Sequence, residues 1–227
     1  MARKRQRRKP PSGHRVLVIG LGRFGGSLAL ELANRGWEVL GLDNDARVVQ
    51  DFRQQLTHTM VVDSTDVEAL RQVGAQEHRR AVVGIGTDLE ASILTTSLLV
   101  DLGVPNIWAK AINRQHGRIL EQIGAHHVVL PEHDMGERVA HLVTGRMLDF
   151  IEFEDDFALA KTVAPAEATD LPLGESRLRA KYGVTVVSIK REGADFTYAT
   201  ADTVIRRDDV LIVAGRTNDV ERFSELV

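Results

Sequence analysis

The sequence predicts an α/β fold in which a Rossmann-like, doubly wound parallel sheet is followed by a small α+β domain. Three observations lead to this prediction. A glycine-rich turn joins an apolar run to an amphipathic segment near the start of the chain, short apolar runs then alternate with helical segments as far as residue 130, and the alternation stops near Asp149. Such alternation is typical of parallel strands joined by crossover helices.

The first domain is expected to span residues 15–148 and to contain six strands. We expect these strands at 16–19, 38–43, 59–62, 80–85, 106–112 and 128–130. Helical segments are expected at 23–36, 45–56, 89–102, 114–123 and 131–148, and another, after Thr65, is expected to run through Leu70 to Gly74. In a doubly wound sheet the ligand lies beyond the carboxyl ends of the strands, where the strand order reverses.

The second domain is expected to span residues 158–227, after a linker at 149–157 that contains an acidic cluster. Its predicted strands are 159–163, 184–189, 197–199 and 209–213, and its predicted helices are 173–181 and 218–226. A unit of about seventy residues buries little apolar surface by itself. We therefore expect this domain to dimerise.

The turn after the first strand has the pattern Gly-x-Gly-x-x-Gly, at Gly20, Gly22 and Gly25. Gly20 permits the tight turn, Gly22 lets the backbone approach a pyrophosphate, and Gly25 lets the helix pack close to the strand. Unpaired N–H groups at the start of the helix can then bind phosphate oxygens. Together with the flanking strands and helix, the motif predicts a nucleotide site.

Two charged residues indicate which nucleotide would bind. Asp43 ends the second strand, where its carboxylate can accept hydrogen bonds from both ribose hydroxyls and would repel a 2′-phosphate, so NADP is disfavoured. Arg23 places a permanent cation inside the phosphate loop, which suits ATP or ADP. The alternative for Arg23 is a solvated arginine at the start of a helix.

The other strand ends supply further candidate nucleotide contacts, which are Ser64, Thr65, Ile85, Gly86, Lys110 and Glu132. For Thr65 the alternative is helix capping, because Thr65 and Glu68 have the spacing of a capping box. For Glu132 two roles stay open. It could bridge bound phosphates through a hard cation such as Mg²⁺ or Ca²⁺, or it could simply favour the helix dipole at the start of its helix.

Composition excludes several classes of protein. The chain has no cysteine, so it cannot form a disulfide framework or a thiolate metal site. No apolar run approaches the roughly twenty residues that a membrane helix needs, and no signal peptide precedes the first strand, so we expect a soluble protein.

The first fourteen residues are expected to be a basic, disordered tail. Arg3, Lys4, Arg5, Arg7, Arg8 and Lys9 give the first nine residues a charge of +6, whereas the whole chain has a net charge of −3. The tail could be a solvated segment, or it could touch anionic lipid headgroups or nucleic acid. Because the rest of the chain is acidic, nucleic acid is not expected as the main partner.

Five blocks of sequence together resemble the regulator of potassium conductance (RCK) family, specifically its KtrA/TrkA-type cytosolic gating subunits. They are Gly20-Leu21-Gly22-Arg23-Phe24-Gly25-Gly26-Ser27, Pro105-Asn106-Ile107-Trp108-Ala109-Lys110, Ile123-Gly124-Ala125, Pro131-Glu132-His133-Asp134-Met135-Gly136 and Arg179-Ala180-Lys181-Tyr182-Gly183. The resemblance covers nearly everything from Val16 onward. It adds Phe24 to the nucleotide-binding residues.

The resemblance implies a nucleotide-sensing regulatory subunit and not an enzyme. ATP would favour the conducting state and ADP the inactive one, with Arg23 touching the terminal phosphate across the dimer and Glu132 near a divalent cation at the same interface. Dimers would form an octameric ring docked beneath a membrane potassium channel subunit of the KtrB/TrkH type, at the inner face of the membrane. Arg179 matches a phosphate contact for cyclic di-AMP, although Arg177 and Leu178 depart from the residues that relatives commonly carry there.

Two other classes of function remain as alternatives. The first is an NAD-dependent oxidoreductase or an NAD(H)-sensing regulator, but the chain after the sheet is short for a substrate domain and shows no arrangement suited to hydride transfer. The second is a DNA-binding repressor, for which the fifteen residues before the first strand are too short and too charged to form a helix-turn-helix.

Overall fold

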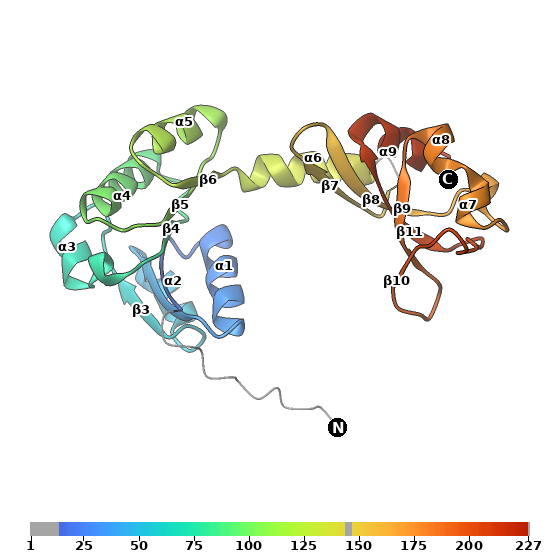
Figure 1. Ribbon diagram of the computed structural model, residues 1–227. Coiled ribbons are helices and arrows are strands. Elements are labelled where there is room, and N and C mark those ends of the chain that lie inside the picture. Colours follow the sequence, from blue (N-terminus) through green and yellow to red (C-terminus); the bar gives the residue numbers. More distant parts are fainter. Residues whose placement is uncertain (1–13, 144–146, 227) are drawn as a thin grey trace, which may run out of the picture. The chain divides into compact units, whose positions relative to one another are not determined.

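The computed structural model describes residues 14–143 and 147–226. The chain divides into two compact units, within residues 1–133 and 134–227, and each is described by itself (Figure 1). The expected tail at 1–14 lies outside the described residues except for His14. No helix in the described ranges is long and apolar enough to cross a membrane.

The first unit contains one parallel sheet of six strands, as expected (Figure 1). The strands are β1 (Arg15–Ile19), β2 (Glu38–Asp43), β3 (His58–Val61), β4 (Ala81–Val83), β5 (Ile107–Lys110) and β6 (His127–Val129). Their order is β3-β2-β1-β4-β5-β6, so the chain runs outward from β1 in one direction and then from β4 in the other. This confirms the doubly wound sheet and places its reversal point between β1 and β4.

Helices cover both faces of this sheet. They are α1 (Arg23–Asn34), α2 (Ala46–Phe52), α3 (Val67–Gln72), α4 (Leu89–Asp101) and α5 (Arg114–Gln122), with a short 3₁₀ turn η1 (Ala75–Glu77) before β4. Side chains of β1 alternate between two cores. Val16 and Val18 join the core under α1 and α2, whereas Leu17 and Ile19 join the core under the later helices. A strand that is buried on both faces is continuously apolar, which is why these strands are readable in the sequence.

The second unit contains one antiparallel sheet of five strands in the order β10-β9-β11-β8-β7. The strands are β7 (Asp149–Phe153), β8 (Phe157–Val163), β9 (Thr185–Lys190), β10 (Thr197–Tyr198) and β11 (Val210–Arg216). The helices are α7 (Leu173–Ser176), α8 (Leu178–Tyr182) and α9 (Thr217–Ser224), with a 3₁₀ turn η2 (Ala166–Ala168) after β8. Phe223 of α9 is fully buried in the core with Leu211 and Val213 of β11.

Residues 149–157 are not a linker, which corrects the expected domain boundary. Asp149–Phe153 form β7, which pairs with β8 from Asp149 opposite Lys161 to Phe153 opposite Phe157. The side chain of Phe150 is only 3% exposed, so this strand contributes to the second core. The turn between the strands has left-handed backbone at Asp155 and Asp156, with φ of 62° and 58°. These acidic residues therefore close a hairpin and do not separate two domains.

Two predicted helices also end differently. The helix expected at 131–148 is observed as α6 (Pro131–Val143), and residues 144–146 of that expectation lie outside the described part of the chain. The helix expected at 173–181 is divided into α7 and α8, because Arg177 between them has a left-handed φ of 52°.

The later part of α6 packs against the second unit. Arg138 donates to the Oδ1 of Asp149 at 2.6 Å, and this hydrogen bond holds the pKa of Asp149 below its usual value. The ring of His141 packs on Phe150 with centroids 4.0 Å apart, and its Nδ1 lies 3.2 Å from Glu221 Oε1 on α9. These contacts explain why the compact second unit begins within α6.

Candidate functional site

A cavity of about 520 Å³ lies at the carboxyl ends of the parallel strands. It gathers residues that are far apart in the sequence because parallel strands all end at the same edge of the sheet. Eleven of the predicted site residues line this one cavity: Gly20, Gly22, Arg23, Phe24, Asp43, Ser64, Thr65, Ile85, Gly86, Lys110 and Glu132. Gly25 is buried beneath the turn, and Arg179 belongs to the second unit.

The glycine turn is as tight as the sequence predicts. Gly20 has a φ of +86°, and a Cβ there would lie 3.0 Å from the backbone nitrogen of Ile85. A Cβ on Gly25 would lie 1.9 Å from the carbonyl oxygen of Gly20, so α1 can pack this closely only with glycine at that position. A Cβ on Gly22 would meet nothing within 4 Å. The turn is therefore open toward the cavity at Gly22 and closed on its inner side.

The start of α1 provides donors for an anion. Among the described residues no side chain caps this helix at Gly22, and its first turn has no acidic residue. The first N–H groups of a helix have no partner inside the helix, and the helix dipole favours negative charge there. Arg23, the exposed first residue of α1, adds a guanidinium to this helix start.

Asp43 has a structural role besides the predicted contact with ribose. Its Oδ2 accepts a hydrogen bond from the backbone N–H of Leu21 at 2.7 Å, and its Oδ1 accepts one from the N–H of Asp45 at 2.9 Å. A carboxylate has about four lone-pair sites, so acceptor capacity remains on both oxygens. Asp43 thus ties the end of β2 to the glycine turn while still lining the cavity.

The loop after β3 corrects the capping alternative for Thr65. The N-cap of α3 is Asp66, whose side chain accepts from the N–H of Glu68 at 2.9 Å. The N–H and the hydroxyl of Thr65 instead both donate to Asp63 Oδ1, and these bonds lower the pKa of Asp63. Ser64 is buried, and its Oγ lies 2.7 Å from Thr95 Oγ1 on α4. Both hydroxyls are therefore held in place by the protein.

Lys110 and Glu132 form an ion pair at the edge of the cavity. Lys110 is only 8% exposed, and its Nζ donates to Glu132 Oε1 at 2.5 Å. The hydrogen bond from Lys110 is the main cause of a lowered pKa at Glu132, and the positive charge of Arg23 contributes to it. Lys110 Nζ also lies 5.8 Å from the centre of the Phe24 ring. One cation is thus held almost buried beside the glycine turn.

The pairing with Lys110 bears on the expected role of Glu132 as a metal ligand. Among the described residues there is no group of three or more His, Cys, Asp or Glu side chains that could hold a metal ion. Because Lys110 already occupies one carboxylate oxygen of Glu132, the protein alone does not form a site for a hard cation. Phosphate oxygens from a bound nucleotide would have to supply the missing ligands.

Several residues that line the cavity were not predicted as contacts. They are Ile19, Asn44, Val48, Val62, Asp63, Gly84, Asp88, Ala91 and Ile112, and Thr87 lines the cavity beside the predicted Gly86. Gly84 carried a usable signal, because it follows β4 directly, and a Cβ there would lie 3.0 Å from the Gly20 carbonyl oxygen. The apolar residues look like ordinary core in the sequence, and only the topology places them here.

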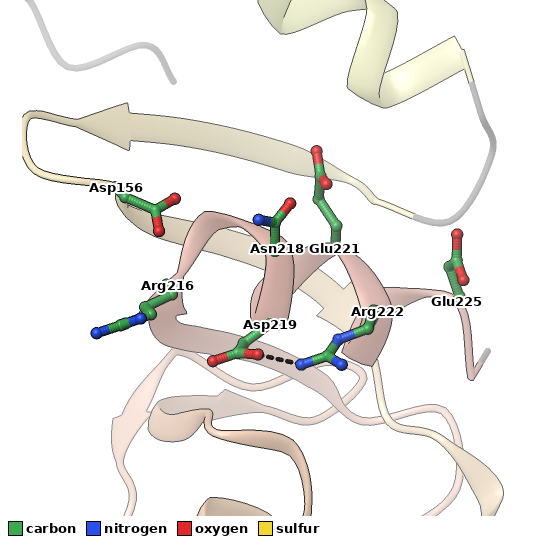
Figure 2. Close-up of a pocket in the computed structure, with 7 residues that line it drawn as sticks. All are labelled: Asp156, Arg216, Asn218, Asp219, Glu221, Arg222 and Glu225. Carbon is green, nitrogen blue, oxygen red and sulfur yellow. Dashed lines mark hydrogen bonds and ion pairs between the residues drawn. The ribbon is translucent and has the colours of Figure 1, made fainter.

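The second unit contains Arg179 and a separate hollow. Arg179 is exposed on α8. The hollow, of about 490 Å³, lies along α9 beside the turn between β7 and β8 (Figure 2). Its charged and polar lining residues are Asp156, Arg216, Asn218, Asp219, Glu221, Arg222 and Glu225. Because Asp219 pairs with Arg222 and the remaining charges are mixed in sign, we assign no ligand to it.

Both units match known protein domains. Residues 16–131 match the TrkA-N domain, and residues 162–227 match the TrkA-C domain. The chain is 40% identical over 211 residues to Ktr system potassium uptake protein C of Bacillus subtilis, covering 92% of this chain and 96% of that protein. It is 36% identical over 207 residues to Ktr system potassium uptake protein A of the same organism, covering 91% and 93%.

Solved structures of lower identity share the fold. The GsuK RCK domain aligns with 100% of this chain and 50% of its own, with a TM-score of 0.66 and 18% identity. The alignment with the GsuK channel bound to NAD covers 99% of this chain and 41% of the GsuK chain, with a TM-score of 0.64 and 17% identity. GsuK bound to ADP aligns with 64% of this chain and 38% of its own, with a TM-score of 0.50 and 16% identity. The present chain thus spans at most half of these GsuK chains.

The domain matches cover most of the chain in the same order as the two units of the structure. The two Ktr proteins exceed 30% identity over more than nine tenths of both sequences, which shows common descent. The chain therefore belongs to the RCK family of TrkA-N and TrkA-C proteins, as a relative of the Ktr system potassium uptake proteins A and C.

Proposed function

We propose that this chain is the nucleotide-sensing regulatory subunit of a potassium uptake system, and that it gates a membrane potassium transporter in response to ATP and ADP. The observation that carries the proposal is the single cavity in which the glycine turn, the start of α1, Asp43, Arg23 and Lys110 meet. The names of the Ktr relatives supply the biological process.

The shape and charge of the cavity suit an adenine nucleotide. Its volume of about 520 Å³ lies within the usual range for ligand pockets of roughly 300–1,000 Å³. Gly22 leaves the turn open for a pyrophosphate, and two cations, at Arg23 and Lys110, flank that position. GsuK structures with NAD and with ADP give the same fold a precedent for nucleotide binding.

Discrimination between ATP and ADP requires a group that senses one phosphoryl group. A ligand shifts a conformational equilibrium only by the difference in its affinity for the two states. Arg23 is exposed at the start of α1, so its guanidinium can reach a terminal phosphate, whereas Lys110 is held by Glu132. About 1–3 kcal/mol of coupling from such a contact would be enough for a switch.

A second candidate, an NAD(H)-sensing regulator, is favoured by the GsuK channel bound to NAD. The predicted contact of Asp43 with ribose does not separate the two candidates, because NAD, ATP and ADP all carry a ribose without a 2′-phosphate. An NAD-dependent oxidoreductase is less well supported. It would need a substrate domain after the parallel sheet, and that part of the chain matches the TrkA-C domain instead. Titration with NADH, together with a test for substrate-dependent oxidation, separates these alternatives.

Further parts of the proposal concern partners and additional ligands. Dimers that assemble into an octameric ring would dock at the inner face of the membrane on a transporter subunit of the KtrB/TrkH type. A Mg²⁺ or Ca²⁺ ion would join Glu132 only together with bound phosphates. Cyclic di-AMP would bind the second unit near Arg179, which is exposed on α8 and accessible to an anionic ligand.

Calorimetric titration tests the proposal directly. Wild-type protein is expected to bind ATP and ADP saturably, and Arg23→Ala is expected to bind both with the same affinity. Arg47→Ala is the matched control, because Arg47 is an exposed arginine in the first turn of α2 that does not line the cavity. An unchanged ratio of ATP to ADP affinity in Arg23→Ala would overturn the assignment of Arg23.

A flux assay tests gating. The protein is added to vesicles that contain the transporter subunit, and potassium uptake is measured with ATP, ADP, NADH or cyclic di-AMP. We expect ATP to raise the flux above the level with ADP in the wild type, and Arg23→Ala to remove this difference. Equal flux with every nucleotide in the wild type would contradict a regulatory role.

A further inference from the structure

The loop that follows β3 borders the part of the cavity where the base of a nucleotide would lie. Its residues Asp63, Ser64 and Thr65 all line the cavity. The sheet has the order β3-β2-β1, the glycine turn follows β1, and Asp43 ends β2. A nucleotide is a linear molecule. With its phosphates at the glycine turn and its ribose at Asp43, its base therefore extends toward the end of β3.

The carboxylate of Asp63 keeps one oxygen available to a ligand. Its Oδ1 accepts hydrogen bonds from the N–H of Thr65 at 2.9 Å and from the hydroxyl of Thr65 at 2.7 Å. Among the described residues, Oδ2 has neither a hydrogen-bond donor nor a cation as a partner. The bonds from Thr65 lower the pKa of Asp63, so the side chain is ionised near neutral pH and can only accept hydrogen bonds.

The two hydroxyl groups beside Asp63 can also only accept from a ligand. Thr65 has a single hydroxyl proton, which it donates to Asp63 Oδ1. Thr95 Oγ1 donates to the carbonyl oxygen of Ser64 at 3.2 Å and lies 2.7 Å from Ser64 Oγ. Both of these contacts are hydrogen bonds only if the Ser64 hydroxyl donates to Thr95. Neither Ser64 nor Thr65 then keeps a hydroxyl proton for a ligand.

One backbone donor lies between these acceptors. Ser64 is only 7% exposed, and within the part of the chain that the structure describes its backbone N–H has no acceptor. A backbone N–H without a partner is uncommon in a buried residue. A ligand atom that accepts a hydrogen bond would satisfy it. The loop thus offers a donor at Ser64 next to an acceptor at Asp63.

Adenine has the complementary pattern. Its 6-amino group donates and its neighbouring N1 accepts, whereas guanine and hypoxanthine have a 6-oxo group that accepts and an N1–H that donates. In the same orientation, a 6-oxo purine would place two acceptors together at Asp63 and two donors together at Ser64. Such a mismatch leaves polar groups unpaired and costs affinity. Val48 and Val62, which also line the cavity, supply apolar surface for a planar base.

We propose that residues 63–65 determine the base specificity of the nucleotide site and select adenine over 6-oxo purines. The 6-amino group donates to Asp63 Oδ2, and N1 accepts from the N–H of Ser64. This inference rests on the proposed nucleotide site. It applies equally to ATP, ADP and NAD, because all three carry adenine.

Calorimetric titration of the full-length protein with ATP and ITP tests this assignment. ITP differs from ATP only in the base, where a 6-oxo group and an N1–H replace the 6-amino group and N1. We expect the wild type to bind ATP about tenfold to a hundredfold more tightly than ITP. Equal affinities would overturn the base assignment and leave nucleotide sensing intact. Failure to bind either nucleotide would overturn the proposed function as well.

Asp63→Asn exchanges the free acceptor for a donor at nearly constant size. The amide oxygen can keep both bonds from Thr65, so the NH₂ group takes the place of Oδ2. We expect the ratio of ATP affinity to ITP affinity to fall at least tenfold, because ITP gains a partner for its 6-oxo group. A ratio that stays at the wild-type value would contradict the role of Asp63.

Asp88→Asn is the matched control for the loss of charge. Asp88 lines the same cavity and accepts a backbone N–H, from Ala91 at 2.9 Å, but it follows β4 and not β3. Its substitution should change the affinities for ATP and ITP by the same factor. If Asp88→Asn lowers the ratio as much as Asp63→Asn does, the loop after β3 does not select the base.

A pair of ligand analogues tests the Ser64 N–H in the wild-type protein. In 1-deaza-ATP a C–H replaces the N1 acceptor, and we expect it to bind about fivefold to tenfold more weakly than ATP. In 7-deaza-ATP the change lies on the opposite side of the ring from N1, and its affinity should stay within about twofold. Equal affinity for ATP and 1-deaza-ATP, or an equal loss with both analogues, would overturn the contact with Ser64.

Discussion

The two units use their sheets differently. In the first unit β1 is buried along Val16–Ile19, because helices cover both faces of the parallel sheet. In the second unit β8 alternates between buried and half-exposed residues from Ala158 to Val163, because only one face of the antiparallel sheet is covered by the core. Parallel strands bring their carboxyl ends to one edge, where loops can build a cavity. Antiparallel strands end alternately at both edges and provide no such convergence.

This comparison places the proposed nucleotide site in the first unit. The largest expected effect tests whether the second unit can be destabilised without changing that site. Phe223→Ala removes a fully buried ring and should cost the second unit about 3–5 kcal/mol of unfolding free energy. Hydrogen exchange reports this loss. Both tryptophans, Trp37 and Trp108, lie in the first unit, so their fluorescence reports the unfolding of that unit.

Affinity for ATP should stay within about twofold of the wild type in Phe223→Ala, since the cavity lies in the other unit. The control is Phe196→Ala, because Phe196 is 40% exposed and its loss should cost less than about 1 kcal/mol. A parallel loss of nucleotide affinity in Phe223→Ala would break the comparison.

The next effect concerns the glycine turn. Gly25→Ala places a methyl group 1.9 Å from the Gly20 carbonyl oxygen, so we expect a loss of about 3 kcal/mol in the first unit together with nucleotide binding. Urea unfolding followed by tryptophan fluorescence measures the loss. Gly136→Ala is the control, since a Cβ there meets nothing within 4 Å and Gly136 lies outside the first unit, so the fluorescence transition should match the wild type. Wild-type ATP affinity in Gly25→Ala would show that the turn does not form the site.

A smaller effect is expected at Lys110. Replacement by methionine keeps most of the buried side-chain volume but removes the charge beside the cavity, and should weaken ATP binding about tenfold to a hundredfold. Lys190→Met, in the second unit, serves as the comparison in the same calorimetric titration. Equal affinity of the two variants would mean that Lys110 serves only to hold Glu132.

The smallest effect is a pH dependence. The hydrogen bond from Lys110 lowers the pKa of Glu132 in the folded state. The stabilisation is therefore complete above the pKa of the unfolded chain and is lost as the pH falls through the lower folded value. Because the Glu132 side chain is 65% exposed, we expect only a few tenths of a kcal/mol. Urea unfolding of wild type and Glu132→Gln between about pH 6 and pH 3 should converge at low pH, and a constant difference would refute this role.

The sequence predicted the first unit best, because its apolar runs and glycine turn match the strands and turns of the parallel sheet. The apolar runs, the glycine turn and the strand-end residues predicted a doubly wound sheet, and eleven predicted residues line one cavity because strand ends converge. The pairing of Lys110 with Glu132 was not predictable, since it joins residues 22 positions apart through tertiary packing. Asp66 as the N-cap was missed because Thr65 matches the capping-box spacing equally well.

Pattern was least informative in the second unit. Asp149–Phe153 contain acidic residues next to exposed Ile151 and Phe153, so the run looked like a linker. It is instead the edge strand of the sheet, where one face and one side are open to solvent. The division of the predicted helix into α7 and α8 at Arg177 could not be predicted either. Arg177 has a left-handed backbone, and a residue other than glycine in that conformation has no clear sequence signal.

Hydrogen exchange with and without ATP tests the assignment of the nucleotide to the first unit most directly. We predict that saturating ATP slows exchange at the amides of residues 20–25 and 84–88, which border the cavity, and leaves β8, β9 and β11 unchanged. Protection confined to the second unit, or no protection at the glycine turn at saturating ATP, would contradict it.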